Sequence, residues 1–178
     1  MNKKILGLLA FPAIVGSMLA PAGSASAVGG APDSVIDPPG IHYLSTAVGG
    51  GKCLAVPANG AYGSTATLVQ CNPFDDQSWT VPQAGTTGVI QNKYFKNAYG
   101  TGCLTAQGGV EGNPAFIYDC TGLRDQLWSA ELVPGRNGSV RYRNVNSSGL
   151  CLTAQGSSVG TAAMIYRCLD FADQIWAA

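Results

Sequence analysis

Six cysteines are the residues of this 178-residue chain whose type and spacing most clearly suggest chemistry. They fall into three pairs, Cys53/Cys71, Cys103/Cys120 and Cys151/Cys168. Six cysteines allow 15 disulfide pairings in principle. The rival use is a metal site, but no two cysteines form a C-x-x-C pair and the chain has a single histidine. We therefore expect disulfides and neither a metal nor another cofactor.

Catalysis would have to use that histidine or the acidic residues. A Ser-His-Asp or Cys-His site needs its histidine held by a partner, and His42 lies beside a Pro- and Gly-rich stretch. Glycoside hydrolysis needs two opposed carboxylates. Asp76, Asp125 and Asp173 recur at nearly equal intervals, so we expect them to be spread around the domain and not to face one another. We expect no enzymatic activity and, because the chain ends two residues after Trp176, no appended catalytic domain.

These aspartates each begin an Asp-Gln-x-Trp segment. The three segments, 76–79, 125–128 and 173–176, contain every tryptophan of the chain. Each tryptophan follows the second cysteine of a pair by eight residues, and the tryptophans are 49 and 48 residues apart. Such register indicates one structural unit written three times. Equivalent cysteines should then be bridged within each unit, which selects one of the possible pairings.

The units run over about 41–82, 88–133 and 139–178. Each contains four short segments rich in β-branched or aromatic residues, separated by Gly- and Asn-rich turns. Units too small to bury their own cores must associate around one axis, and a closed barrel removes open strand edges. The sequence thus predicts an all-β fold, a β-trefoil of three four-stranded repeats with pseudo-threefold symmetry. A three-bladed propeller ranks second because propellers usually have more blades.

The N-terminus is typical of an exported protein. Lys3 and Lys4 precede an apolar run, 5–20, and the segment ends in Ala25-Ser26-Ala27. We interpret residues 1–27 as a signal peptide, because the run is short for a membrane-spanning helix. Residues 28–40 are expected to be a leader or linker, and 41–178 the folded domain. The predicted location is secreted, which favours disulfides.

Charge narrows the possible partners. Without Lys3 and Lys4 the chain has 8 basic and 10 acidic residues, a net charge of about −2. No basic cluster is present, so binding to nucleic acid or to an anionic membrane surface is not expected.

The paired cysteines, the Cys-Leu start of the second strand and the closing Gln-x-Trp resemble the ricin B-type lectin repeat. The resemblance extends over all three units. It implies a β-trefoil that binds galactose-like or other sugars at up to three shallow pockets, one per unit. In that family such a domain often targets a toxin or glycosidase.

A sugar receptor needs an aromatic ring under the apolar C–H face and short polar groups for the hydroxyls. The family's ring lies two residues before the second cysteine, where this chain has Val69, Tyr118 and Tyr166. Its polar pair is an Asn or Asp followed by the glutamine of Gln-x-Trp. The resemblance therefore implies these carbohydrate-binding residues: Thr105, Tyr118, Asp125, Gln126, Thr153, Tyr166, Asp173 and Gln174. Packing roles remain open for the tyrosines, and backbone-bonding roles for the glutamines and aspartates.

One departure from the family is serious. Its sugar-binding members have an Asp two residues after the first cysteine, and this chain has Ala55, Thr105 and Thr153 there. A threonine hydroxyl replaces a charged acceptor, and charge-assisted hydrogen bonds are about twice as strong as neutral ones. Unit one, which has neither ring nor carboxylate, is expected to be structural. Units two and three are expected to bind sugar weakly.

Neighbouring residues could compensate for the lost carboxylate. Asp119 or Glu111 could serve unit two, and Arg167, with Asp170 nearby, could turn unit three towards acidic sugars. Two functions follow as hypotheses. The first is a secreted lectin-like module that binds a glycan or polysaccharide through units two and three. The alternative is a trefoil that has lost sugar binding and acts on a protein partner as an interaction or inhibitor module.

Overall fold

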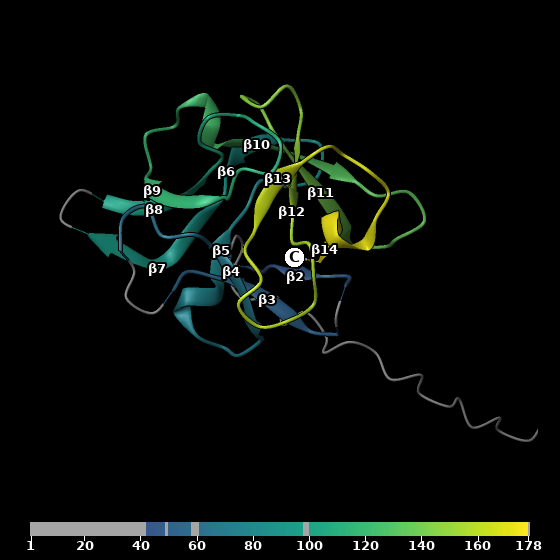
Figure 1. The fold of residues 1–178 in the computed structure, drawn as a ribbon, viewed down its shortest axis with the longest axis horizontal. Helices are drawn as coiled ribbons and strands as arrows, with labels where there is room; N and C mark the ends of the chain where they lie inside the picture. The colour runs from purple at the N-terminus through teal and green to yellow at the C-terminus, as the bar shows by residue number, and fades with distance from the viewer. Residues whose placement is uncertain (1–41, 49, 58–60, 98–99, 178) are drawn as a thin grey trace, which may run out of the picture. The chain divides into compact units, whose positions relative to one another are not determined.

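The computed structural model describes residues 42–48, 50–57, 61–97 and 100–177. The proposed signal peptide and leader lie outside these residues. The elements are β1 His42–Tyr43, β2 Ser45–Thr46, β3 Lys52–Ala55, β4 Thr67–Gln70, η1 Asp75–Gln77, β5 Ser78–Thr80, β6 Thr87–Val89, β7 Gln91–Asn97, β8 Gly100–Thr105, β9 Phe116–Asp119, η2 Arg124–Gln126, β10 Leu127–Leu132, β11 Ser139–Asn144, β12 Cys151–Thr153, β13 Met164–Tyr166, η3 Ala172–Gln174 and β14 Trp176–Ala177. Figure 1 shows them in chain order.

The same hairpin occurs once in each unit. Strand β3 pairs antiparallel with β4, β8 with β9 and β12 with β13. In each hairpin the first cysteine lies opposite position 69, 118 or 166, two residues before the second cysteine. The disulfides are Cys53–Cys71, Cys103–Cys120 and Cys151–Cys168. The predicted pairing within units is therefore confirmed.

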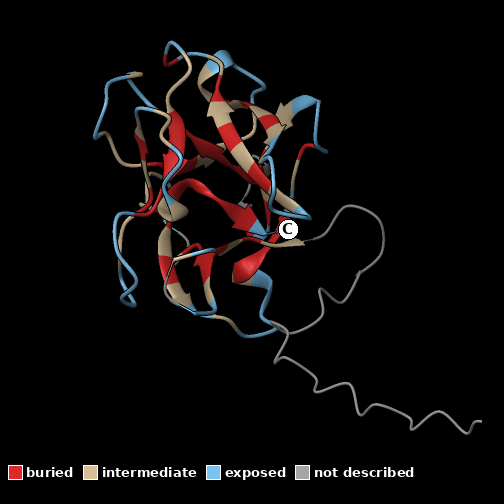
Figure 2. Ribbon diagram, turned by 90° about the vertical axis from the view of Figure 1, so that its right-hand side faces the viewer, coloured by how far each residue is buried: buried red, intermediate tan, exposed pale blue. Residues whose placement is uncertain are grey.

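The three tryptophans belong to one core. Each is fully buried, together with the leucine that follows the first cysteine of its unit. Figure 2 shows the buried parts of the chain in red, and they lie mainly along the strands. The indole Nε1 donates a hydrogen bond to the carbonyl of that leucine: Trp79 to Leu54 at 2.8 Å, Trp128 to Leu104 at 2.9 Å and Trp176 to Leu152 at 3.1 Å. Burial of so large a side chain with its N–H satisfied is a major source of stability. The predicted common hub is thus present.

Backbone bonds join the units in a closed ring. The N–H of Ala66 donates to the carbonyl of Ala115, Ala115 to Ala163, and Ala163 back to Ala66, at 2.8 to 2.9 Å. All three alanines are buried, and a larger side chain would not fit where three hairpins meet. The β-trefoil prediction is confirmed.

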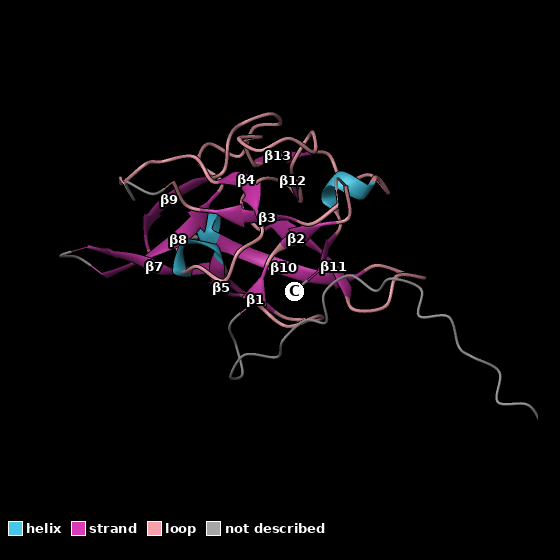
Figure 3. Cartoon of the chain, turned by 90° about the horizontal axis from the view of Figure 1, so that it is seen from below, coloured by secondary structure: helices cyan, strands magenta, loops and turns pink. Residues whose placement is uncertain are grey.

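Two details differ from four unbroken strands per unit. The first strand is interrupted in units one and two, as β1/β2 and β6/β7, but continuous in unit three as β11. The interruptions at Leu44 and Ile90 occur where the strand changes partners: β1 pairs with β5 but β2 with β14, and β6 pairs with β10 but β7 with β5. Each fourth strand is also preceded by a one-turn 3₁₀ helix, cyan in Figure 3. A single turn is too short to give a helical period in the sequence.

No helix among the described residues is long and apolar enough to cross a membrane.

Candidate ligand-binding sites

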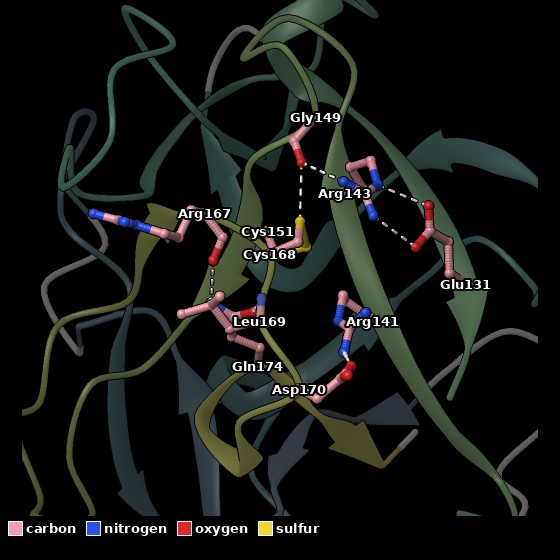
Figure 4. A network of polar contacts seen from close by, with 10 residues as sticks. All are labelled: Glu131, Arg141, Arg143, Gly149, Cys151, Arg167, Cys168, Leu169, Asp170 and Gln174. Carbon is pink, nitrogen blue, oxygen red and sulfur yellow. Dashed lines mark hydrogen bonds and ion pairs between the residues drawn. A yellow bond between two sulfur atoms is a disulfide. The ribbon is translucent and has the colours of Figure 1, made fainter. Parts of the chain in front are cut away.

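The glutamines of the repeated segments are buried and tie each 3₁₀ turn to the third strand. Gln126 Oε1 accepts the N–H of Thr121 at 2.8 Å, and its Nε2 donates to the carbonyl of Asp119 at 2.7 Å. Gln174 makes the equivalent bonds, from the N–H of Leu169 and to the carbonyl of Arg167, both at 2.7 Å (Figure 4). A buried amide must be satisfied in this way. The glutamines thus fix the position of the aspartate before them.

The two threonines lie beneath the surface. Thr105 is 3% exposed and Thr153 is fully buried. Each hydroxyl donates to the carbonyl of the cysteine two residues earlier at 3.0 Å, and Thr105 Oγ1 also accepts from Gln126 Nε2 at 3.2 Å. In unit one the same position, Ala55, is also buried. These side chains are therefore placed to support the site from below.

The aspartates are half-buried at the start of the closing segments. The backbone carbonyl of Asp125 accepts from the N–H of Ala106 at 2.8 Å and from Asn144 Nδ2 at 2.9 Å. The carbonyl of Asp173 accepts from the N–H of Ala154 at 2.9 Å. Asp173 Oδ1 is buried and has no hydrogen-bond partner among the described residues. Its burial raises the pKa of the Asp173 carboxyl.

In unit two, the ring of Tyr118 lies among aromatic neighbours. Tyr62, from the turn of unit one, meets it edge to face with ring centroids 4.6 Å apart, and Phe116 lies 6.2 Å away. The Tyr118 hydroxyl donates to Gln107 Oε1 at 3.3 Å. A side chain at Gly63 would approach that hydroxyl to 3.3 Å, so glycine allows the turn to pass close to the ring.

In unit three, Tyr166 has a charged neighbour instead. The Arg167 guanidinium lies 5.4 Å from the centre of the Tyr166 ring, within cation–π range. Its Nε donates to Glu111 Oε1 at 2.7 Å. This hydrogen bond lowers the pKa of Glu111 and raises that of Arg167. The positive charge is therefore fixed beside the ring by a residue of unit two.

The structure places two of the neighbouring acidic residues. The turn that carries Glu111 pairs with unit three, where the N–H of Gly112 donates to the carbonyl of Ile165 at 2.8 Å. Asp170 accepts from Arg141 Nη2 at 2.7 Å (Figure 4). Each candidate site is thus built at a junction, with its third strand from one unit and a turn from the unit before.

The sequence did not single out Tyr62 as a site residue, and it offered Glu111 to unit two, whereas the Glu111 carboxylate accepts from Arg167 of unit three. Tyr62 and Glu111 both occupy the position just before the turn glycine. The spacing of the repeats shows that these two positions are equivalent. It does not show that the turn of each unit pairs with the following unit. Among the residues that the structure describes, no group of three or more His, Cys, Asp or Glu side chains could hold a metal ion.

Residues 91–178 match the model of the ricin-type beta-trefoil lectin domain family. This chain carries a ricin-type β-trefoil lectin domain. The fold of the domain extends through unit one, which precedes the matched residues. No curated protein sequence matches the chain.

Solved structures show the same fold at low sequence identity. The designed threefold-symmetric protein ThreeFoil is 17% identical, with a TM-score of 0.65 over 77% of this chain and 96% of that one. The earthworm R-type lectin C-half, solved with GalNAc, is also 17% identical, with a TM-score of 0.56 over 78% and 96%. The agglutinin of Abrus precatorius is 25% identical, with a TM-score of 0.57 over 76% of this chain and 46% of the longer agglutinin chain.

Proposed function

We propose that this chain is a secreted, non-catalytic module that binds carbohydrate weakly, mainly through units two and three. The observation that carries the proposal is the placement of a half-buried tyrosine and a half-buried aspartate at each site, tied together by one buried glutamine. A ring and a short acceptor so placed suit the apolar face and the hydroxyls of a pyranose.

The eight candidate residues divide into two roles. Tyr118 and Asp125 in unit two, and Tyr166 and Asp173 in unit three, are the groups that touch sugar. Beneath them lie the supporting residues Thr105, Thr153, Gln126 and Gln174. The supporting side chains have little capacity left to bond a sugar directly. The glutamine amides already bond backbone groups, and the threonine hydroxyls donate to backbone carbonyls.

Weak binding follows from the missing carboxylate. The alanine and threonines that replace it are buried and uncharged, so these positions offer no charged acceptor to a sugar. Two weak sites on one domain can still hold a polymer by avidity, provided that both engage one chain or surface. A repetitive polysaccharide or a densely glycosylated surface is therefore the proposed target.

The test is an NMR titration of the mature protein with galactose, GalNAc and xylose. Wild type should show shifts at units two and three, and Tyr118→Ala/Tyr166→Ala should lose them. Val69→Ala, at the equivalent position of unit one, is the matched control and should bind like wild type. Sugar binding that survives loss of both tyrosines would contradict the proposal.

Secretion is tested separately. Expression of the full chain with its N-terminus should release protein into the medium, with a mature N-terminus at Val28 by mass spectrometry. The three disulfides suit an oxidising compartment. Retention of residues 1–27 in the product would contradict this part of the proposal.

A second function, protein interaction without sugar binding, is favoured by one observation. Arg167 and Tyr62 already occupy positions beside the two rings that a sugar would use. Tyrosine and arginine are also enriched at protein interfaces. If the mature protein binds no member of a glycan array but captures a protein from culture supernatant, this second function replaces the first.

A further inference from the structure

A hollow of about 550 Å³ lies at the junction of units one and two, and its lining contains no residue of the Tyr118 and Tyr166 sites. Its lining residues are Pro73, Phe74, Asp75, Asp76 and Tyr94. Phe74 is 61% exposed and Tyr94 49% exposed, so both rings are available to solvent. Large rings left exposed beside a hollow are unusual on a soluble surface and mark binding sites more often than scattered apolar residues do.

The walls of this hollow are held in place by a buried asparagine. Asn92 is fully buried, and its Nδ2 donates to the carbonyl of Asp76 at 2.9 Å. Its Oδ1 accepts the N–H of Tyr94 at 3.0 Å. The Asn92 side chain therefore fixes both the η1 turn and the part of β7 that carries Tyr94. The backbone carbonyl of Phe74 is also engaged, by the N–H of Gln77 at 3.0 Å and by Ser78 Oγ at 3.2 Å.

The hollow is acidic as well as aromatic. Two carboxylates line it, and one of them, Asp75, pairs with Lys93 at 3.2 Å. Both partners of this pair are about half exposed, at 47% for Lys93 and 59% for Asp75. Such a surface pair contributes little, so an incoming cation can compete with Lys93. The local charge, two carboxylates against one ammonium, favours a cationic ligand over an anionic one.

The junction of units two and three lacks this combination. At the junction of units two and three, the positions of Phe74, Asp75 and Tyr94 hold Leu123, Arg124 and Asn146. Asn144 makes the same clamp there, to the carbonyl of Asp125 at 2.9 Å and from the N–H of Asn146 at 3.0 Å. These two junctions therefore share the scaffold, and the first of them adds two rings and a second carboxylate to it.

From these features we infer that the hollow between η1 and β7 is a separate binding site for an amino sugar with a free ammonium group. The pyranose places its apolar face against Phe74 or Tyr94, and the ammonium lies between the aromatic rings and the carboxylates of Asp75 and Asp76. Aromatic faces and carboxylates both attract a cation, and the rings also contact the sugar C–H groups. The inference stands independently of sugar binding at Tyr118 and Tyr166.

Calorimetric titration of the mature protein with a glucosamine tetramer tests it, at a pH where the amines are protonated. The acetylated tetramer serves as the neutral counterpart and a galacturonic acid tetramer as the anionic one. We expect the glucosamine tetramer to bind at least several-fold tighter than either. Phe74→Ala/Tyr94→Ala should weaken it by roughly ten-fold, as expected for loss of two ring contacts with a cation. Asp75→Asn/Asp76→Asn should remove the preference over the acetylated tetramer.

A matched control separates this site from the next junction. Leu123→Ala, at the equivalent position there, should bind the glucosamine tetramer like wild type. Thermal unfolding of each variant checks that the fold persists. Equal affinity for the free and acetylated tetramers, or full binding by Phe74→Ala/Tyr94→Ala, would overturn the inference. Neither result would bear on neutral-sugar binding at Tyr118 and Tyr166.

Discussion

The candidate sites of units two and three share one scaffold but have different chemistry beside the ring. Each has a tyrosine on the third strand, an aspartate on the 3₁₀ turn and a buried glutamine between them. In unit two the turn of the preceding unit supplies an aromatic ring, Tyr62. In unit three it supplies Glu111, which holds the Arg167 guanidinium beside Tyr166. Repetition therefore fixes the positions, while one turn residue sets the character of each site.

Both candidate sites rest on one common core, and removal of an indole from that core is the most severe test of this dependence. Trp128→Ala should lower the free energy of unfolding by about 3–5 kcal/mol, because it leaves a large cavity and an unpaired Leu104 carbonyl. Urea unfolding followed by circular dichroism measures the loss. The tyrosines of both units should lose their ordered environment together. Loss of order in unit two alone would show that the units are independent.

Disulfides give a more local comparison. Cys103→Ser/Cys120→Ser and Cys151→Ser/Cys168→Ser each open a loop with the same sequence separation of 17. The chain-entropy model gives about 3 kcal/mol for a loop of this length, so both variants should lose similar stability. Chemical denaturation of the two variants and wild type measures it. A large inequality would reveal that one hairpin is supported by other contacts.

The scaffold could be predicted from the sequence, but the different neighbours of the two tyrosine rings could not. The tryptophan and cysteine register predicted the trefoil, the disulfide pairing and the buried hub, because each depends on residues equivalent in all three units. The neighbours of Tyr118 and Tyr166 depend on which unit each turn contacts. That is decided by the cyclic backbone bonds through Ala66, Ala115 and Ala163, and spacing along the chain does not encode it.

Burial of the threonines was also beyond the sequence. Thr105 and Thr153 occupy the family's carboxylate position, yet their hydroxyls turn to the cysteine carbonyls two residues earlier. Such local bonds are open to threonine on its own strand. The hollow at Phe74 and Tyr94 was hidden for another reason, since its two rings come from different units and the Asn92 side chain fixes the backbone near both.

Alanine substitution of the residue beside each ring should change the sugar affinity of the two sites in different ways. Arg167→Ala uncovers the Tyr166 ring, so neutral sugar should bind unit three a few-fold tighter, as removal of an exposed cation–π contact of about 0.5–1 kcal/mol allows. Tyr62→Ala removes an aromatic contact without changing charge, so it should weaken unit two, and salt should not alter that effect. NMR titrations at low and high salt report each site separately. If each variant changes the sugar affinity of both sites equally, the residues beside the rings do not determine the difference between the sites.

The smallest expected effect concerns the carboxylate of unit three. Burial raises the pKa of Asp173 above its ordinary 3.8, so the folded state binds the proton more tightly than the unfolded state does. The buried charge therefore costs stability at neutral pH, and the cost disappears as the pH falls through the raised pKa. Asp173→Asn should stabilise the protein slightly at pH 7, by less than about 0.5 kcal/mol as for most surface changes.

The same variant should also flatten the pH dependence of stability between pH 7 and pH 4, which thermal unfolding across that range measures.

The turn that carries Asp173 differs from its counterparts in the other two units. Asn92 and Asn144 clamp the turns of Asp76 and Asp125 through their carbonyls. The position paired with Trp176 is instead Thr46, whose hydroxyl donates to the carbonyl of Val48 at 2.6 Å. Asp125→Asn is the matched control in unit two, and an equal stabilisation there would mean that the effect is not specific to the unclamped turn.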